Sequence, residues 1–204
     1  MIERITTGSF MTNSYVISNE KKECIIVDPG LDYKEASIYI KSKYVPKAII
    51  LTHCHLDHVD GIQYFMDLPI YIHKFEEDGL YDCNISLYSI MERSTPFSYG
   101  DLDIRLVDNG DIISLIGYDI KVYHTPGHTK GSSIYYFNNK LLTGDTLFRG
   151  SCGRTDFPTG DMELMTKSLE RIITTFDDDV ECYPGHDGET TIGFERKNNP
   201  YINY

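Results

Sequence analysis

The chain of 204 residues is predicted to form an α+β protein with one domain, residues 1–204. Two observations lead to this fold class. Runs of strand character fall into two β-rich halves, and each half is followed by segments with the apolar spacing of a helix. The length lies in the range of a single domain, and no internal repeat or low-complexity linker divides it. We therefore expect a single fold across the whole chain.

The first half begins with strands and a helix. Three short runs read as strands: Ile2 to Ile5, Ser14 to Ser18 and Cys24 to Val27. Apolar residues at helical spacing then predict a helix from Tyr33 to Lys43, which Pro46 ends. The apolar run from Ala48 to Leu51 is too short for a helix and predicts a buried strand.

A polar stretch, Thr52 to His58, follows that buried run. Ionisable side chains at the end of a core strand are poorly solvated, and a bound cation is the usual compensation. Neutral imidazole and ionised carboxylate suit zinc, manganese or iron. The candidate ligands are His53, His55, Asp57 and His58. The alternative is a polar loop whose histidines form only local hydrogen bonds.

The remainder of the first half is less regular. Val59 to Leu68 is predicted to be a helix that Pro69 ends, and Ile70 to His73 is predicted to be the next strand. Residues Phe75 to Tyr99 show little periodicity. For them we expect a helix and a following loop that lies beside the polar stretch.

The second half is mainly β-structure before two helices. Its predicted strands are Asp103 to Val107, Asp111 to Leu115, Asp119 to His124, Ser132 to Phe137, Lys140 to Thr143 and Val180 to Tyr183. Asp161 is a candidate N-cap for a helix. Its apolar face is predicted to contain Met162, Met165, Leu169, Ile172 and Phe176. A short helix is expected within Glu189 to Tyr204.

Three further candidate ligands stand in glycine-bounded turns that follow predicted strands. They are His128, Asp145 and His186. With the first four they make a set that is too large for one tetrahedral zinc but suits two metals that share a carboxylate.

Composition excludes several classes of function. The formal charge of −12 opposes non-specific binding to nucleic acid. The sequence contains no apolar run of about 18 residues and no N-terminal signal pattern, so neither a membrane span nor export is predicted. Five cysteines without a CxxC pair suit reduced thiols. We therefore expect a cytoplasmic protein; its oligomeric state is left open.

The ordered motifs HxHxDH, TPGHT, GD and PGH resemble those of the metallo-β-lactamase-fold hydrolases. The turn Asp28-Pro29-Gly30, the run Gly144 to Pro158 and the ending from Tyr183 through Glu195 to Tyr201 resemble the small glyoxalase II-like (hydroxyacylglutathione hydrolase-like) group. The resemblance covers essentially the whole chain. It implies a four-layered αβ/βα sandwich without the C-terminal helical substrate domain of longer members.

The resemblance also implies a ligand set. One metal would take His53, His55 and His128, and the second would take Asp57, His58 and His186. Asp145 would bridge them, and a hydroxide between the metals would be the nucleophile. Asp57 and Asp145 are thus the expected catalytic residues, and two zinc ions are the expected cofactors, with iron or manganese also suited. Asp28 would lie near the metals without binding them, either as a support or as a simple turn residue.

The expected partner is a small thioester similar to S-lactoylglutathione. Ser151-Cys152-Gly153-Arg154 stands where longer members have a GCGK-type loop, which makes Arg154 a candidate substrate-binding residue. Asp156 and Phe157 occupy the region of an expected tyrosine, so another thiol carrier or a smaller thioester is also open.

Other activities of the same fold remain as alternatives. One is a persulfide dioxygenase with a single iron, whose members resemble the run Arg149 to Phe157. A β-lactamase is less favoured, because the carboxylate Asp57 and the loop at Arg154 point to the thioesterase branch. A non-catalytic metal-binding protein would be expected to have lost ligands, and every ligand position is filled.

Overall fold

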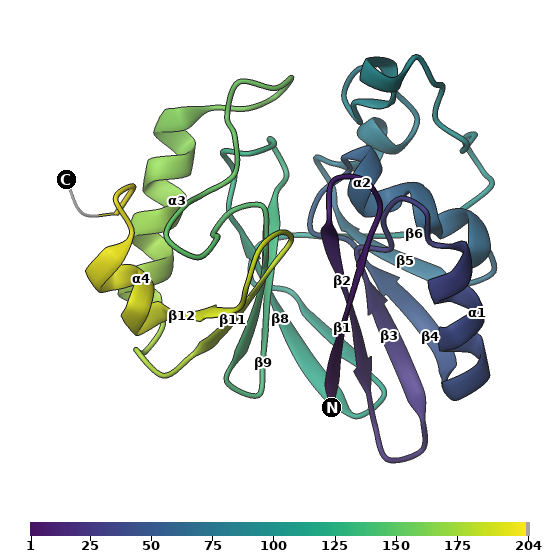
Figure 1. Cartoon of the computed structure of the whole chain (residues 1–204), viewed down its shortest axis with the longest axis horizontal. Helices are drawn as coiled ribbons and strands as arrows, with labels where there is room; N and C mark the ends of the chain where they lie inside the picture. Colours follow the sequence, from purple (N-terminus) through teal and green to yellow (C-terminus); the bar gives the residue numbers. More distant parts are fainter. Residues whose placement is uncertain (203–204) are drawn as a thin grey trace.

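The computed structural model describes residues 1–202, and in it two six-stranded sheets face each other (Figure 1). The first sheet has the order β1-β2-β3-β4-β5-β6. Its strands are β1 (Ile2–Thr7), β2 (Thr12–Ser18), β3 (Glu23–Val27), β4 (Val45–Ile50), β5 (Pro69–His73) and β6 (Asp103–Val107). The second sheet has the order β12-β11-β10-β9-β8-β7. Its strands are β7 (Ile112–Leu115), β8 (Tyr118–His124), β9 (Ser133–Phe137), β10 (Lys140–Gly144), β11 (Glu181–Pro184) and β12 (Thr190–Thr191).

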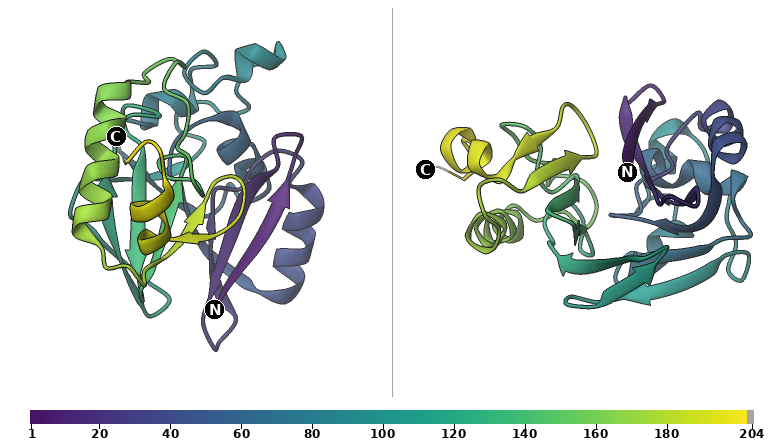
Figure 2. Two further views of the ribbon diagram at one scale, coloured as in Figure 1. Left: turned by 60° about the vertical axis from the view of Figure 1, so that its left-hand side comes forward. Right: turned by 90° about the horizontal axis from the view of Figure 1, so that it is seen from below.

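Helices cover the outer face of each sheet (Figure 2). α1 (Lys34–Lys43) lies against the first sheet, and α3 (Met162–Thr175) and α4 (Ile192–Asn198) lie on the side of the second (Figure 1). The short α2 (Leu56–Val59) follows β4. The layers therefore run helix, sheet, sheet, helix, and the expected four-layered sandwich is confirmed. None of the helices in residues 1–202 is long and apolar enough to cross a membrane.

Alternation along the strands builds the core on both faces of each sheet. In β3, Ile25 and Val27 belong to the cluster between the sheets, whereas Cys24 and Ile26 pack in the cluster on the α1 side. Successive side chains of a strand point to opposite faces, so a strand that is buried on both faces is apolar throughout. This explains the continuous apolar runs in the second parts of β3 and β4, Cys24 to Val27 and Ala48 to Ile50, whereas the first residues of both strands are less buried and include Glu23 and Lys47.

Strand direction brings the candidate ligands to one edge of the sandwich. β3, β4 and β5 run parallel, so the residues that follow Val27 and Ile50 emerge at the same edge of the first sheet. In the second sheet β10 and β11 also run parallel, and Asp145 and His186 follow their ends. Connections after parallel strands are a usual location for binding sites.

The predicted helix from Val59 to Leu68 is wrong. The helix begins earlier, at Leu56, and continues only as a 3₁₀ segment, η1 (Asp60–Tyr64). The backbone N–H of Gly61 donates to Pro29 O at 2.9 Å instead of to the preceding helical turn. An α-helix cannot continue where a backbone N–H donates outside the helix rather than to the carbonyl four residues earlier. The contact with the Asp28-Pro29-Gly30 turn therefore determines the conformation of η1.

The predicted helix between Phe75 and Tyr99 is also wrong. The segment contains two short 3₁₀ turns, η2 (Glu77–Leu80) and η3 (Tyr88–Met91), and no α-helix. Leu87 and Glu92, which flank η3, have φ of 65° and 54°. This left-handed conformation interrupts a right-handed helix, so tertiary contacts rather than local preference shape the segment.

The later helices agree with the sequence. Asp161 accepts a hydrogen bond from Leu164 N at 2.9 Å, which confirms the predicted N-cap of α3. The predicted apolar face is buried at Met165, Leu169, Ile172 and Phe176, but Met162, the first residue of the helix, is exposed. α4 confirms the short helix after Glu189; Asn203 and Tyr204 lie outside the described residues.

Candidate metal centre

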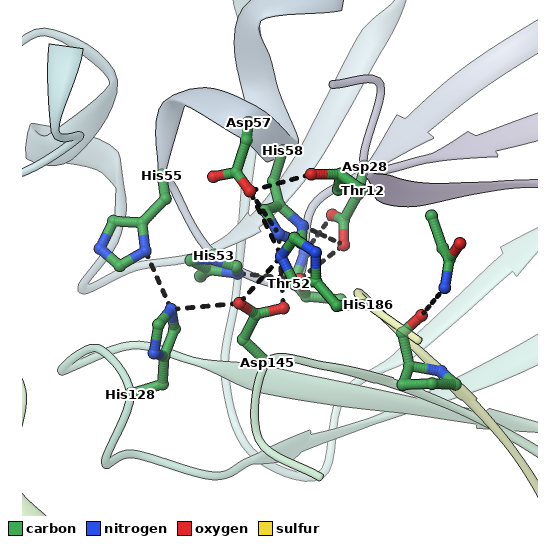
Figure 3. Close-up of polar contacts among 12 residues, drawn as sticks. Thr12, Asp28, Thr52, His53, His55, Asp57, His58, His128, Asp145 and His186 are labelled. Atoms are coloured by element: carbon green, nitrogen blue, oxygen red, sulfur yellow. Dashed lines mark hydrogen bonds and ion pairs between the residues drawn. The ribbon is translucent and has the colours of Figure 1, made fainter. Parts of the chain in front are cut away.

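The candidate ligands meet where the ends of the two sheets approach each other (Figure 3). β4 ends at Ile50 and α2 begins at Leu56, so His53 and His55 lie on the connecting loop while Asp57 and His58 belong to the first turn of α2. The turn at Gly30 supports that helix: a Cβ on Gly30 would lie 2.1 Å from Asp57 O, so this approach requires glycine.

All seven predicted ligands come together in three overlapping groups. Within each group the potential ligand atoms lie within 4.8 Å of one another. The groups are His53, His55 and His128; His53, His58 and Asp145; and Asp57, His58 and His186. Residues from three turns of the second half thus join the polar stretch of the first half.

Buried atoms without partners test whether a cation fits. Among the described residues, Nε2 of His53, Nε2 of His58 and Oδ1 of Asp145 are buried and have no hydrogen-bond partner. Leaving such polar atoms unpaired costs on the order of 1–3 kcal/mol each. Nδ1 of His55 and Nε2 of His128 also lie only 2.9 Å apart. A divalent cation would pair the free atoms of His53, His58 and Asp145 and would take the place of the hydrogen bond between His55 and His128, so the donor set fits a metal.

Hydrogen bonds on the opposite ring nitrogens orient four of the histidines. Nδ1 of His128 donates to Arg154 O at 2.7 Å, and Nδ1 of His186 donates to Phe10 O at 3.1 Å. A carbonyl can only accept, so each neutral ring keeps its lone pair on Nε2, which faces the centre. Nδ1 of His58 is held in the same way by the Asp28 carboxylate at 3.0 Å, and Nδ1 of His53 lies 3.1 Å from Thr52 Oγ1.

Burial and neighbouring charges set the protonation of the centre. Burial lowers the pKa of His55 to about 3 and lowers the pKa of His53 well below its usual range, which keeps both rings neutral. Burial also opposes ionisation of Asp57, but the charge of His58 and the hydrogen bond from His186 outweigh it and lower the Asp57 pKa to about 2. Burial opposes a charge on His58 and His186, but the carboxylates of Asp145 and Asp57 outweigh it and raise both pKa values, that of His186 to about 10. The centre therefore offers ionised carboxylates beside the neutral rings of His53 and His55, and His58 and His186 would each release a proton on binding a metal.

Asp145 occupies the middle of this arrangement. Its Oδ1 lies 3.4 Å from His58 Nε2, and its Oδ2 lies 3.5 Å from His128 Nε2 and 3.4 Å from His186 Nε2. Burial disfavours the Asp145 carboxylate, but the adjacent His58 and His186 hold its pKa well below the usual range. The two carboxylate oxygens thus face both groups of histidines.

Asp28 supports the centre from behind without belonging to any ligand group. Its carboxylate accepts hydrogen bonds from Thr52 N at 2.8 Å, Thr52 Oγ1 at 2.6 Å and His58 Nδ1 at 3.0 Å. Asp28 is 2% exposed. The sequence left two roles open for Asp28, a support for the metal ligands and a simple turn residue. The geometry favours the supporting role.

Replacing Asp28 by asparagine is expected to weaken metal binding about 10- to 100-fold, chiefly at the group that contains His58. The amide nitrogen of asparagine is a donor, and it would face Thr52 and His58, whose atoms already donate to this position. Titration of the metal-free protein with zinc against a competing chelator measures the loss, and Asp32→Asn, an exposed position on the same loop, is the control. Equal affinity of the two variants would contradict a supporting role for Asp28.

Sequence reasoning missed Glu76, whose buried carboxylate links two ligand loops. Its Oε2 accepts from Cys54 N at 2.9 Å, and its Oε1 accepts from Gly131 N at 2.7 Å. Cys54 lies between two candidate ligands, and Gly131 lies three residues after His128. No spacing signal connects Glu76 with either loop, because these contacts arise only from the fold.

The Glu76→Gln variant is expected to lose one of these two hydrogen bonds, since its amide nitrogen would face a backbone N–H. A buried donor left unpaired costs about 1–3 kcal/mol. Thermal unfolding should show the loss of stability. The d–d absorption of bound cobalt(II) should change as well, because the ligands His53, His55 and His128 stand on the two loops that Glu76 links. Glu77→Gln, at the neighbouring and less buried position, should change neither; an unaltered Glu76→Gln protein would refute the link.

A pocket of about 310 Å³ opens above the centre. Asp57, His128, Asp145 and His186 contribute to its floor, and Arg154 is the cationic residue of its lining. The remaining wall is apolar and includes Phe10, Leu56, Leu87, Ile90, Phe148 and Phe157. The segment between Phe75 and Tyr99 thus does lie beside the metal motif, through Leu87 and Ile90.

The fold and this centre define a metallo-hydrolase. The chain belongs to the metallo-beta-lactamase superfamily, whose family description matches residues 7–186. Its relatives include Hydroxyacylglutathione hydrolase GloC of Haemophilus influenzae, which is 32% identical over 213 residues that cover 99% of this chain and 98% of that protein. The predicted resemblance to the glyoxalase II-like group is confirmed.

Solved structures give the same fold. The BLEG-1 B3 metallo-beta-lactamase superposes with a TM-score of 0.91 at 33% identity and covers 100% of both chains. TTHA1623 in a di-iron-bound form superposes with a TM-score of 0.81 at 29% identity, over 98% of this chain and 99% of that one. Proteins of this fold therefore bind divalent metals, and a neighbour with two irons leaves the identity of the metal here open.

Proposed function

We propose that this protein is a binuclear metal-dependent thioesterase that hydrolyses hydroxyacyl thioesters of the S-lactoylglutathione kind. His53, His55 and His128 would hold one metal, and Asp57, His58 and His186 the second. Asp145 would bridge them. Zinc is the proposed metal, the substrate is a small molecule, and the proposed location is the cytoplasm.

The observation that carries this proposal is the position of Asp145. Its Oδ2 lies 3.5 Å from His128 Nε2 in one ligand group and 3.4 Å from His186 Nε2 in the other. A carboxylate that faces two sets of histidine lone pairs is suited to bridge two cations. The glyoxalase II-like relative supports a thioester as the substrate.

When bound, the two metals would lower the pKa of a shared water and polarise the carbonyl of the substrate. The residues of the chain place these groups. Asp57 is fixed by a hydrogen bond from Thr12 Oγ1 at 2.9 Å, and the orienting bonds on the histidines aim each Nε2 at the centre. The water oxygen would add to the carbonyl carbon, the carbon–sulfur bond would break, and the products would be a hydroxy acid and a thiol.

Arg154 is the proposed contact for the polar end of the substrate. It lines the pocket, and its guanidinium, which pairs with Asp156 in this structure, would bind a substrate carboxylate in a bidentate manner by exchanging that partner. Its backbone carbonyl has a separate role, because it accepts the hydrogen bond of His128. A side-chain variant of Arg154 therefore leaves the orientation of His128 intact.

Hydrolysis of a β-lactam is a second candidate, since BLEG-1 shares 33% identity over the full length of both chains. Both reactions add water to an acyl carbon and break its bond to the leaving group. A persulfide dioxygenase with one iron is the third.

Metal analysis of the purified protein, combined with three assays, separates these candidates. The assays are turnover of S-lactoylglutathione, turnover of a β-lactam, and oxygen uptake with glutathione persulfide. Two metals per chain with thioester hydrolysis alone is the expected result. One iron per chain with oxygen consumption would overturn the proposal in favour of the dioxygenase, and preferential β-lactam hydrolysis would overturn it in favour of the lactamase.

A further inference from the structure

The wall of the pocket contrasts with its floor. In the described part of the chain, Arg154 supplies the one polar side chain of the pocket lining besides the candidate ligands. The other lining side chains are apolar, and Phe10 and Ile90 expose 43% and 58% of their surface at the rim. Exposed large apolar side chains around a concave site mark a surface that binds an apolar group.

Aromatic rings continue this wall down to the ligands. The ring of Phe157 packs edge-on against His55 at a centroid distance of 5.8 Å, and the ring of Phe148 packs edge-on against His186 at 5.7 Å. Phe10 is fixed beside the same centre, because its carbonyl accepts the hydrogen bond from His186. A group attached to the reacting carbon or sulfur would therefore meet aromatic surface directly beyond the metals.

The opposite side of the wall is held in place by the metal motif. Asp60, two residues after His58, accepts hydrogen bonds from the Tyr88 hydroxyl and from Arg93 Nη2, both at 3.0 Å. Leu56 N, within the motif, donates to Ser86 O at 2.8 Å. These bonds fix the segment that carries Leu87 and Ile90, so the apolar wall is a built part of the site.

Arg154 contributes little free positive charge to this pocket. Its Nε and Nη2 donate to the two carboxylate oxygens of Asp156 at 2.9 and 2.7 Å, and its guanidinium lies over the Phe157 ring at 4.2 Å. Asp156 thus compensates the charge, and the whole chain carries a net charge of −12. A substrate with several anionic groups gains little here.

We propose that the thioester cleaved at this site carries an uncharged apolar arm next to the reacting bond, and that this arm lies against Phe10, Ile90 and Phe157. This inference rests on the proposed thioesterase activity and narrows its substrate class: hydrolysis of the thioester bond is kept, but a neutral apolar group is preferred to the anionic glutathione, because Asp156 already pairs with Arg154. The arm belongs either to the acyl group or to the thiol, and the two sources share the same chemistry.

Two series of thioesters distinguish the sources in the metal-loaded protein. The first series extends the acyl group from acetyl to hexanoyl on the neutral thiol N-acetylcysteamine; the second keeps acetyl and exchanges N-acetylcysteamine for benzyl mercaptan or for glutathione. Each added methylene that becomes half-buried should raise kcat/KM about twofold. Across the series that varies the group in the pocket, acyl or thiol, kcat/KM should therefore rise about tenfold or more. The glutathione thioester should not exceed the neutral one.

Ile90→Ser is the test variant, and Met91→Ser is its matched control. Both residues are exposed in η3, but only Ile90 lines the pocket. Ile90→Ser should reduce the rise along the series about threefold, and Met91→Ser should leave it unchanged. Asp156→Asn, which frees Arg154, should shift the preference toward the glutathione thioester.

Binding without turnover gives an independent measurement. The thioethers S-methyl- and S-hexyl-N-acetylcysteamine cannot be hydrolysed, and calorimetry should show tighter binding of the hexyl compound with a more negative heat-capacity change. Thioester turnover that does not vary along either series, or that favours glutathione in the unmodified protein, overturns the apolar arm but leaves the thioesterase standing. Failure to hydrolyse any thioester with two metals bound would overturn both.

Discussion

Replacing Asp145 by alanine is expected to remove both metals and to lower kcat/KM for a thioester about 1,000-fold or more, since two bound metals supply several kcal/mol of transition-state stabilisation. Both oxygens of Asp145 face histidine nitrogens of the two ligand groups at 3.4–3.5 Å. Its loss would leave six ligands in two separate groups of three without the charge that joins them. Metal content after dialysis and thioester turnover measure the effect.

Asp57→Ala provides the comparison that makes this result specific. Asp57 lies 3.3 Å from His186 Nε2 and 3.6 Å from His58 Nε2, and both of these histidines belong to the proposed second metal, so Asp57 would hold that metal alone. This variant should keep one metal in the group of His53, His55 and His128. An Asp145→Ala protein that retains two tightly bound metals and full turnover would exclude the bridging assignment.

The sequence predicted the strands and the meeting of the seven ligands because both depend on local signals. Continuous apolar runs mark strands that are buried on both faces, and glycine-bounded turns mark their ends. Where parallel strands end at a common edge, those turns converge, as the turns of Asp145 and His186 do. The layered arrangement itself came from the family resemblance, since strand order alone does not determine which faces pack together.

The parts that the sequence did not predict depend on contacts between distant residues. Glu76 links the ligand loops by accepting hydrogen bonds from the backbone of Cys54 and Gly131, and the backbone carbonyl of Arg154 orients His128. Neither contact leaves a periodic pattern in the chain, although the sequence did single out the Arg154 side chain. The expected helix between Phe75 and Tyr99 failed for the same reason. Bonds from Asp60 to Tyr88 and Arg93 stabilise an irregular conformation there, and that conformation supplies the pocket wall.

Gly185 is the second position where a small change should have a large effect. A Cβ at this position would lie 2.2 Å from Asp145 Oδ1 and 2.7 Å from His58 Cε1. The backbone cannot move away easily, because Gly185 N donates to Gly144 O at 2.9 Å and Gly185 O accepts from Asn13 N at 2.7 Å. The added methyl group of alanine must therefore displace Asp145 or His58.

Displacement of a catalytic group by about 1 Å can cost on the order of 100-fold in rate, so Gly185→Ala should lose about that much activity together with the metal of the His58 group. Gly188→Ala is the matched control, because a Cβ at Gly188 meets no atom within 4 Å. Metal content, turnover and thermal unfolding of both variants should be compared. Equally tight binding of two metals by Gly185→Ala and Gly188→Ala would contradict this prediction. Asp145 and His58 could then bind metal from positions other than those in this structure, and the close approach of Gly185 would not be what holds their side chains in place.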